Sequence, residues 1–517
     1  MMELEKSRNA RRNIFWGILN RFVSIILPFI NRTVFLYILG VELLGLNSLF
    51  MSVLQVLNLA EMGVGSAMVF SMYRPIAEGN RNLVCALLSL YRKIYRWIGI
   101  VILLGGLILM NFLPYLVHDK PPDNVSLYWP YLIYLLNTVI SYFCFGYKSS
   151  LPTAFQRTDF INNISSMTKV LESCIQIFFL YIVSSYYIYL SVMPFVTLLN
   201  NIMIARLVDK NYPEYHCEGI VPRGIKRNIF RKVCGIFIDK VCGTTRNSLD
   251  SICISMYVGL SITAIYNNYL YVVMAVTGVF GVIGASIVAG IGNSMVIYDC
   301  EKNYQDMRRI NFIYMIISGW ITVAMFSLLQ PFMELWVGEK LMFSLDVVFL
   351  LSVYFYMLRM GDVRAIYSNA AGLWWETRYR AIVESVANVL LNLVLGKLFG
   401  VIGIILATIL SLFFINFCWG SQIVFLHYFK NGKIGRYYIE HMMYGLGTII
   451  VAIVTFLIAT FFDGGKLENF LYRSIVCLII PAVLYYLLWH RTNIYCEAME
   501  WFLVRMKMKR KFKFLLR

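Results

Sequence analysis

Two Asn-Arg pairs interrupt the first long apolar stretch of the chain, Asn20-Arg21 and Asn31-Arg32. Eleven residues make about three turns of an α-helix, so both pairs share one face and are stacked about 16 Å apart. A cation inside an apolar span is costly and usually serves a polar path, and arginine binds phosphate oxygens through two parallel hydrogen bonds. We interpret the arginines as a ladder for an anionic substrate, with Asn20, Asn31 and, in the next stretch, Asn58 as polar lining. The alternative is that both arginines snorkel toward the membrane surfaces.

Carboxylates in two further apolar stretches are candidates for ion coupling or for salt bridges. Glu61 is an isolated carboxylate in the second stretch, where burial raises its pKa and suits a proton acceptor. A salt bridge from Glu61 to an arginine of the first stretch is an equally open role. The seventh stretch carries Asp239, Lys240, Arg246 and Asp250. Arg246 and Asp250 are spaced i, i+4 on a helix and can pair, so Asp250 is the second candidate for coupling.

Two more groups of charges favour structural roles. Lys169 and Glu172 in the fifth stretch are spaced i, i+3 on one helix, which favours a structural pair over a ligand-binding one. Arg359, Asp362 and Arg364 lie near one end of the tenth stretch, where we expect a solvated gate.

The elements that must position these residues are membrane-spanning helices. Hydrophobic residues make up 59% of the chain and charged residues 14%, and a span needs roughly 20 mostly apolar residues. We therefore predict an all-α integral membrane protein of about fourteen transmembrane helices. The expected spans are 13–39, 43–73, 95–117, 126–150, 160–183, 186–206, 233–258, 262–297, 311–337, 343–366, 380–400, 401–426, 440–462 and 469–489.

The loops predict the topology and exclude several classes of protein. The net charge of +18 comes from basic residues that gather in alternate connections, on the side of the N-terminus. This placement follows the positive-inside rule, so it predicts two cytoplasmic termini and argues against nucleic-acid binding. The opposite loops, such as 118–125 and 463–468, are too short to carry an enzyme site. No phosphate-binding loop, nucleophile motif or metal-ligand spacing is present, so we expect no enzyme activity, no metal and no cofactor.

An internal repeat divides the chain into two halves. Arg12 to Phe15 (RNIF) reappears as Arg227 to Phe230, and Gly40 to Asn47 (GVELLGLN) resembles Gly259 to Asn267 (GLSITAIYN). Six spans separate the copies, so both halves have the same orientation and are related by an axis along the membrane normal, with a cavity between them. The predicted parts are a first lobe, a linker, a second lobe, a helix pair and a basic tail: 1–207, 208–232, 233–430, 431–490 and 491–517.

The chain resembles the polysaccharide flippases (Wzx-like) of the multidrug/oligosaccharidyl-lipid/polysaccharide exporter superfamily. The resemblance rests on residues 59–80 (LAEMGVGSAMVFSMYRPIAEGN), on 241–269 and on 369–411, and it extends over nearly the whole chain. It implies two six-helix lobes, two additional C-terminal helices, alternating access and a cationic cavity. It also implies that Arg21, Arg32, Lys240 and Arg246 contact the substrate.

These observations combine into one hypothesis. The resemblance implies a flippase of the bacterial cytoplasmic (inner) membrane that moves an undecaprenyl-diphosphate-linked oligosaccharide to the outer leaflet for O-antigen, capsule or exopolysaccharide assembly. A proton or sodium gradient is the expected driving force, and the expected partners are the lipid-linked oligosaccharide, membrane lipids and other polysaccharide assembly proteins. The alternative is a cation-coupled multidrug exporter on the same fold. A scaffold that docks partners through the basic tail after residue 503 is the third hypothesis.

Overall fold

The computed structural model describes residues 20, 23–61, 64–117, 125–155, 157–227, 244, 248–373, 375–430, 433–462 and 464–505. Every regular element in these residues is a helix, and none of them forms a strand. The chain divides into two compact units, Met1–Asn267 and Asn268–Arg517. The predicted linker at 208–232 stays a prediction. In its described part, α8 continues to Asn211 and residues 223–227 are helical.

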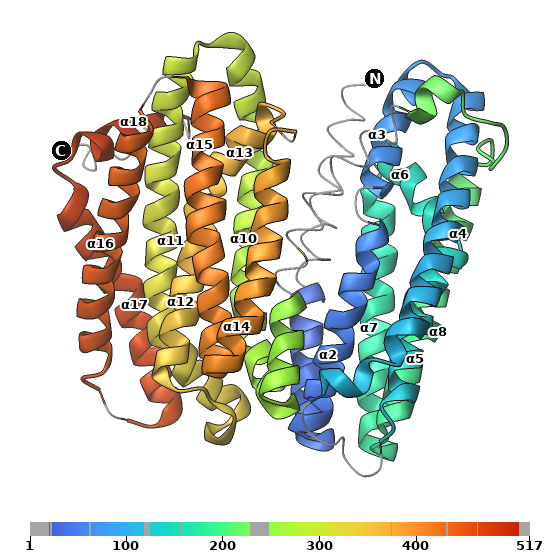
Figure 1. Cartoon of the computed structure of the whole chain (residues 1–517), viewed down its shortest axis with the longest axis horizontal. Coiled ribbons are helices and arrows are strands. Elements are labelled where there is room, and N and C mark those ends of the chain that lie inside the picture. The colour runs from blue at the N-terminus through green and yellow to red at the C-terminus, as the bar shows by residue number, and fades with distance from the viewer. Residues whose placement is uncertain are drawn as a thin grey trace. The chain divides into compact units, whose positions relative to one another are not determined.

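The first unit is a bundle in which α7 and α5 pack against α8, and α4 packs against α5 (Figure 1). Its interior contains Phe35, Leu49, Phe50 and Tyr131, each with no exposed surface. Its elements are Val23–Leu39, α2 (Val41–Leu57), η1 (Asn58–Glu61), α3 (Val64–Ala77), α4 (Arg81–Met110), η2 (Leu113–Leu116), α5 (Tyr128–Phe143), η3 (Gly146–Ser149), α6 (Ser150–Ala154), α7 (Thr158–Val183), α8 (Tyr186–Asn211), residues 248–257 and the beginning of α10 (Leu260–Ile297).

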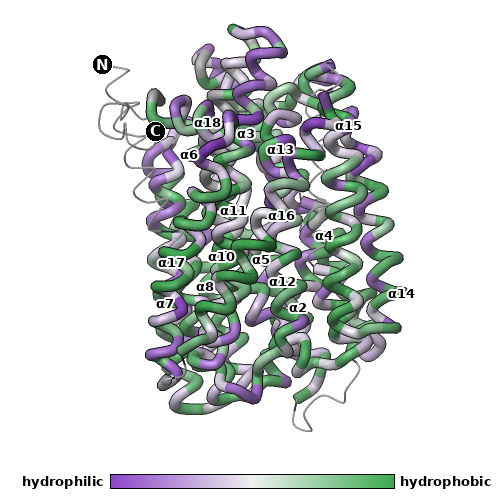
Figure 2. Tube along the Cα trace, turned by 90° about the vertical axis from the view of Figure 1, so that its left-hand side faces the viewer, coloured by the Kyte–Doolittle hydropathy of each residue, from purple (hydrophilic) through white to green (hydrophobic). Residues whose placement is uncertain are grey.

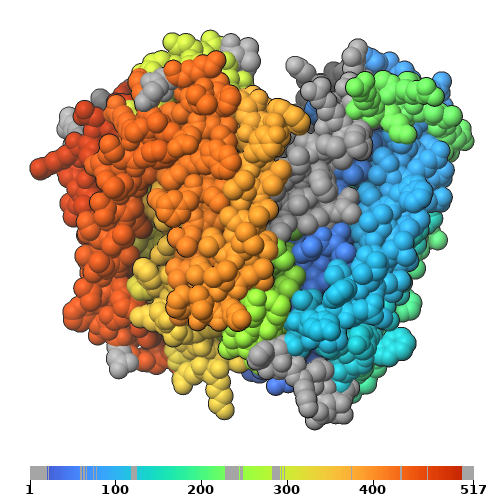
Figure 3. Space-filling model, viewed as in Figure 1, coloured from blue at the N-terminus to red at the C-terminus, as the bar shows by residue number. Residues whose placement is uncertain are grey.

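The second unit is built around α11, which packs against α12, α16, α17 and α18. Its largest fully buried side chains are aromatic: Tyr269, Tyr304, Phe355, Tyr367, Tyr437 and Tyr444. In Figure 3 the orange residues of α14 and the segments after it cover much of one face of this unit. Its elements after α10 are α11 (Cys300–Val337), η4 (Glu339–Leu341), α12 (Leu345–Met360), α13 (Asp362–Ala370), α14 (Arg378–Leu410), η5 (Ser411–Trp419), α15 (Gly420–Val424), η6 (Phe425–Phe429), α16 (Ile434–Ala459), α17 (Lys466–Trp489) and α18 (Asn493–Arg505).

The helices have the length and the surface of membrane spans. Among the described residues, eight helical stretches are long and apolar enough to cross a bilayer, and Val23–Leu39 and Val41–Leu57 are shorter apolar helices. The stretch Arg378–Phe429 holds two expected spans, and Gly400 interrupts it with φ 57° and ψ −132°. Purple, hydrophilic residues in Figure 2 gather mostly near helix ends. Helix is present in the described part of each of the fourteen expected spans, so the all-α membrane fold is confirmed.

Both copies of the internal repeat begin at a glycine in a left-handed conformation. Gly40 has φ 87° and separates the helix Val23–Leu39 from α2, and Gly259 has φ 123° and separates residues 248–257 from α10. Side chains with a Cβ rarely adopt such φ values, so the glycine allows one helix to end and the next to begin within one residue at Gly40 and two at Gly259. The two copies therefore share a local structure as well as a sequence pattern.

Within the first unit, α2 and the first turn of α10 approach each other at Gly45. A Cβ atom built on Gly45 would lie 2.0 Å from the carbonyl oxygen of Leu260. Small residues allow helix backbones to approach closely in membrane proteins, where packing replaces the hydrophobic effect between helices. Gly45 thus permits the contact that joins α2 to α10.

We predict that Gly45→Ala lowers the thermal unfolding temperature of the purified protein by several degrees. The added methyl group meets backbone, which cannot rotate away, and overpacking of this kind costs about 1–3 kcal/mol. Gly435→Ala is the matched control, because a Cβ at Gly435 in the first turn of α16 meets nothing within 4 Å. Alanine there should leave stability unchanged or raise it slightly. Equal unfolding temperatures for Gly45→Ala and the wild type would contradict the close contact.

Candidate functional site

A polar seam joins the first helix to α7 in the first unit. The asparagines of both Asn-Arg pairs and a serine between them bond to one face of α7. The bonds join Asn20 to Ser166 (3.1 Å), Ser24 to Lys169 (2.7 Å) and Asn31 to Gln176 (2.6 Å). The shared polar face inferred from the eleven-residue spacing therefore exists, and on its asparagine side it packs on a neighbouring helix. Whether Asn20 and Asn31 also line a cavity stays a prediction.

Arg32 lies one residue beyond that seam and turns toward other helices. Its Nη2 atom donates to the carbonyl oxygen of Ala264 in α10 (3.2 Å) and lies 3.4 Å from the hydroxyl of Ser48 in α2. Arg32 is half-buried. The guanidinium thus occupies the junction of three helices of the first unit, where a charge-assisted bond to a carbonyl offsets part of its desolvation.

Glu61 is held by tyrosines. The Tyr95 hydroxyl donates to one carboxylate oxygen of Glu61, and the Tyr142 hydroxyl donates to the other at 2.6 Å. The Tyr142 hydroxyl also lies 3.3 Å from Oδ1 of Asn58. Among the described residues no basic side chain forms an ion pair with Glu61, and Arg32 bonds to other groups. The two phenol donors therefore give Glu61 hydrogen-bond partners that do not depend on a salt bridge.

The backbone around Glu61 departs from a regular α-helix. The α-helical part of α2 ends at Leu57, η1 forms one tighter turn that ends at Glu61, and α3 begins at Val64. Broken helices at membrane depth are tolerated where they are buried in protein or line a polar cavity, since freed backbone groups need partners. Asn58 and Glu61 therefore combine a helix break with a half-buried polar cluster, an arrangement typical of sites in transporters.

Asp250 is buried in the first unit. Its side chain is 2% exposed, and the Tyr266 hydroxyl lies 3.4 Å from its Oδ2 atom. Next to it, Ser251 and Asn267 bond to each other at 3.2 Å, so a polar face of residues 248–257 packs on the first turns of α10. Lys240 and Arg246, which are the expected cations of this stretch, and Arg21 of the first stretch lie outside the described residues.

The second unit contains a buried polar chain that joins Arg364 to Arg380 and Glu384, two residues that are not among the sequence-predicted site residues. Arg364 donates to Oδ1 of Asn416 at 2.9 Å, the Nδ2 atom of Asn416 donates to Glu384 at 2.8 Å, and Arg380 forms an ion pair with Glu384. Arg364, Arg380 and Glu384 are 3%, 8% and 6% exposed. The i, i+4 spacing of Arg380 and Glu384 is a signal that the sequence carried. Their burial was not visible, because Arg380 reads as one more loop cation.

The expected solvated gate at Arg359, Asp362 and Arg364 is wrong. Arg359 is 6% exposed and forms an ion pair with Asp362 at 2.8 Å, and the Tyr314 hydroxyl donates to the same carboxylate. The guanidinium also faces the ring of Phe280, 5.4 Å from its centroid. Packing of α12 and α13 against α11 buries Arg359 and Arg364 in the interior of the second unit, while the Asp362 side chain stays 29% exposed.

Comparison with known proteins places the chain in a family. Residues 10–288, which are more than half of the chain, match the family described as polysaccharide biosynthesis protein. No curated protein matches the sequence.

Among solved structures, the chain is similar to the lipid II flippase MurJ in an inward closed conformation (TM-score 0.66, 14% identity, 92% of this chain and 99% of that chain). It is also similar to an inward-facing multidrug resistance transporter of the MATE family (TM-score 0.59, 15% identity, 80% and 99%). A third similar structure is a MOP superfamily transporter from Pyrococcus furiosus (TM-score 0.51, 15% identity, 81% and 96%). The chain therefore belongs to the polysaccharide biosynthesis protein family and has the fold of the lipid flippase and multidrug transporters of the MOP superfamily.

Proposed function

We propose that this protein is a flippase that moves an undecaprenyl-diphosphate-linked oligosaccharide from the cytoplasmic to the outer leaflet for surface polysaccharide assembly. The observation that carries the proposal is the joint family and fold assignment: a polysaccharide biosynthesis family over residues 10–288 and a fold that covers 99% of a lipid II flippase. The protein acts as a transporter without covalent chemistry. It resides in the bacterial inner membrane with both termini in the cytoplasm, as the placement of its basic loops predicts.

The expected cations are suited to bind the diphosphate of the substrate. Arg32 presents a half-buried guanidinium, and its partners include the neutral carbonyl of Ala264 and the hydroxyl of Ser48. A diphosphate carries more charge than these groups and accepts two parallel bonds, so it is the stronger partner for the planar fork of arginine. Arg21, Lys240 and Arg246 complete the cationic path in this proposal, and Asn20, Asn31 and Asn58 supply polar contacts.

If substrate binding breaks the bond between Arg32 and the Ala264 carbonyl, it frees the first helix and α10 to move relative to each other. Arg32 links the first helix to α10, and the Leu260 backbone of α10 rests on Gly45 of α2. A substrate that takes the guanidinium away from α10 therefore loosens one contact of a three-helix junction. Similar folds have been solved in inward-facing and outward-facing conformations, which supports alternating access for this chain.

Coupling to a proton gradient is proposed at Glu61. A deprotonated carboxylate accepts bonds from both Tyr95 and Tyr142, whereas protonation converts one oxygen into a donor that competes with a phenol. The protonation state of Glu61 therefore changes how η1 packs on α4 and α5. Asp250 is the second candidate, since it is buried beside Tyr266.

A multidrug exporter is the second candidate function, because the fold also matches multidrug resistance transporters. A cationic drug is repelled by a cavity whose expected charges are arginines, so the charge of the path favours the flippase. Docking of other assembly proteins on the basic tail is a further proposal, and residues 506–517 lie outside the described structure.

We predict that Arg32→Ala lowers flipping roughly ten- to one-hundred-fold, because a charge-assisted bond contributes about 1.5–3 kcal/mol. The measurement is leaflet-selective labelling of lipid-linked oligosaccharide in a deletion strain that carries each variant. Arg32→Lys should keep part of the activity, since it retains the charge and loses the fork. Arg96→Gln is the control, because Arg96 is an exposed cation of α4. Normal outer-leaflet labelling with Arg32→Ala, or greater sensitivity of the deletion strain to cationic drugs with unchanged labelling, would contradict the flippase mechanism.

We predict that Glu61→Gln removes the acceleration of transport by an imposed pH gradient. Glutamine preserves the shape of the side chain and cannot exchange a proton, so substrate still binds but is no longer coupled to protons. The measurement is transport of labelled substrate in proteoliposomes with and without the gradient, with Asp250→Asn in parallel. Tyr95→Phe should keep a response to the gradient with an altered pH dependence. An unchanged response in Glu61→Gln would remove Glu61 from the coupling path.

A further inference from the structure

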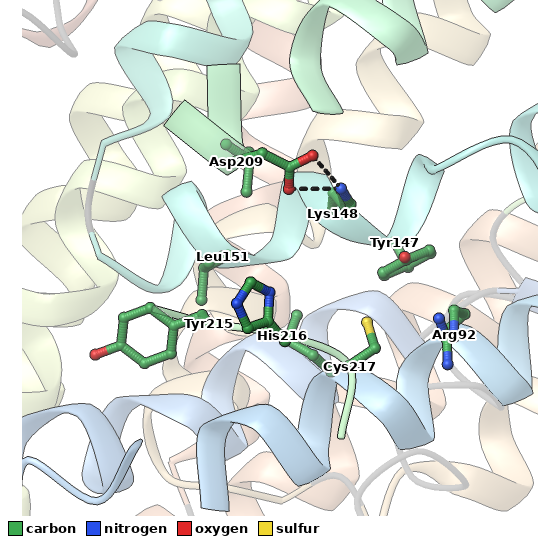
Figure 4. Close-up of a pocket in the computed structure, with 10 residues that line it drawn as sticks. Arg92, Tyr147, Lys148, Leu151, Asp209, Tyr215, His216 and Cys217 are labelled. Carbon is green, nitrogen blue, oxygen red and sulfur yellow. Dashed lines mark hydrogen bonds and ion pairs between the residues drawn. The ribbon is translucent and has the colours of Figure 1, made fainter. Parts of the chain in front are cut away.

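A pocket of about 170 Å³ lies at the end of the first unit where α8 leads into the following segment. Its walls come from α4, from η3 and α6, from α8, and from Tyr215, His216 and Cys217 after α8. The volume is more than ten times the roughly 10–15 Å³ that one ordered water needs. Figure 4 shows the side chains that line it, with His216 near the centre of the view. The pocket is therefore large enough for a small polar group.

The segment after α8 forms a fixed wall of this pocket. Tyr212 stacks on Phe155 with 4.8 Å between the ring centroids, and Arg81 donates from Nε to the carbonyl oxygen of Glu214 at 2.5 Å. Val221 is 7% exposed. The expected linker is thus docked on the first unit along this part of its length, and the position of its pocket-lining residues is defined by packing.

The polar groups of the pocket favour an anion. Lys148 and Asp209 neutralise each other in an ion pair of 2.6 Å, drawn with dashed lines in Figure 4. Arg92 lines the same pocket as the Tyr147 ring, and among the described residues it forms no ion pair with a carboxylate. One guanidinium charge therefore remains uncompensated in a partly enclosed space. Arginine is the side chain best suited to phosphate oxygens.

Arg92 lies at the depth of lipid headgroups. About 27 Å of helix separates it from the end of α4 at Met110, which matches a hydrocarbon core of about 30 Å. On the same helix Arg96 is exposed and Trp97 is 68% exposed, and tryptophan and basic residues are typical of the membrane interface. A phosphate at this level is available from phospholipids and from the adjoining water.

We propose that this pocket is a phosphate-binding site in which Arg92 holds the phosphate oxygens and Tyr147 and His216 contribute further hydrogen bonds. The phosphate comes from an anionic phospholipid headgroup or from free phosphate. Binding ties the segment after α8 to α4, because the ligand contacts both walls. The site lies outside the proposed path of the oligosaccharide and does not depend on the flippase proposal.

The test measures binding of phosphatidylglycerol to the purified full-length protein by native mass spectrometry, with Arg92→Gln as the variant. We expect an about tenfold weaker occupancy of the tightest lipid site, since a charge-assisted bond is lost. Arg96→Gln is the matched control: it removes the same charge one turn further along α4, outside the pocket lining, and should bind as the wild type does. Arg92→Lys should bind with intermediate affinity if it folds as the wild type, which its elution on size exclusion reports.

A competition with inorganic phosphate separates the two sources. Lipid occupancy that depends on Arg92 and resists millimolar phosphate assigns the site to a headgroup. If inorganic phosphate displaces the lipid from the wild type but not from Arg92→Gln, the pocket is a site for free phosphate. The proposal would be overturned if Arg92→Gln bound lipid and phosphate as the wild type does. It would also be overturned if Arg96→Gln lost as much binding as Arg92→Gln. Flipping activity is a separate readout, so failure of the flippase proposal would leave these outcomes unchanged.

Discussion

A charge inside a membrane protein must find a partner within the protein, and this requirement organises both units. The hydrocarbon offers no water, so an ionised side chain between the helices needs a carbonyl, a hydroxyl or an opposite charge as its partner, and three charges in the described part of the chain show this. Arg32 donates to a carbonyl and lies near a hydroxyl, Glu61 accepts hydrogen bonds from two phenols, and Arg380 forms an ion pair with Glu384. The contacts of Arg32 and Glu61 join elements that are separate in the sequence, whereas Arg380 and Glu384 pair within α14 and Glu384 reaches Asn416 of η5.

The same requirement explains where the helices break. The helix of the second span breaks at η1, beside the tyrosines that bind Glu61. In the second unit, η5 is a π-helical segment, and the carbonyl oxygen of Asn416 within it accepts a bond from Arg364. Wider or tighter turns release backbone groups from the regular pattern, and these segments are frequently found at functional sites. Helix irregularity and buried charge therefore occur at the same places in this protein.

The polar groups of the first unit form three separate sites, each suited to a different ligand. The Arg32 junction suits an anionic substrate, the Glu61 cluster suits a proton, and the Arg92 pocket suits a phosphate at headgroup depth. The three sites are distinct: the Arg32 guanidinium bonds to a carbonyl, the Glu61 carboxylate accepts from two phenols, and Arg92 lines a separate pocket. The buried charges of the second unit are paired with one another, which fits an interior role.

The sequence by itself determined the membrane class, the spans and the family. The length of an apolar stretch and the placement of basic loops depend on local composition. The sequence therefore predicts about fourteen spans, with a boundary after Gly400, and a repeated motif that begins at Gly40 and at Gly259. The eleven-residue spacing also predicted that Asn20 and Asn31 share a face. Only the tertiary structure decided what that face contacts, that tyrosines hold Glu61, and that Arg359, Arg364 and Arg380 are buried. Helical periodicity specifies the direction in which a side chain leaves the axis of its helix. The partner of that side chain depends on which helix packs on that face, and contacts between residues far apart in the chain decide the packing.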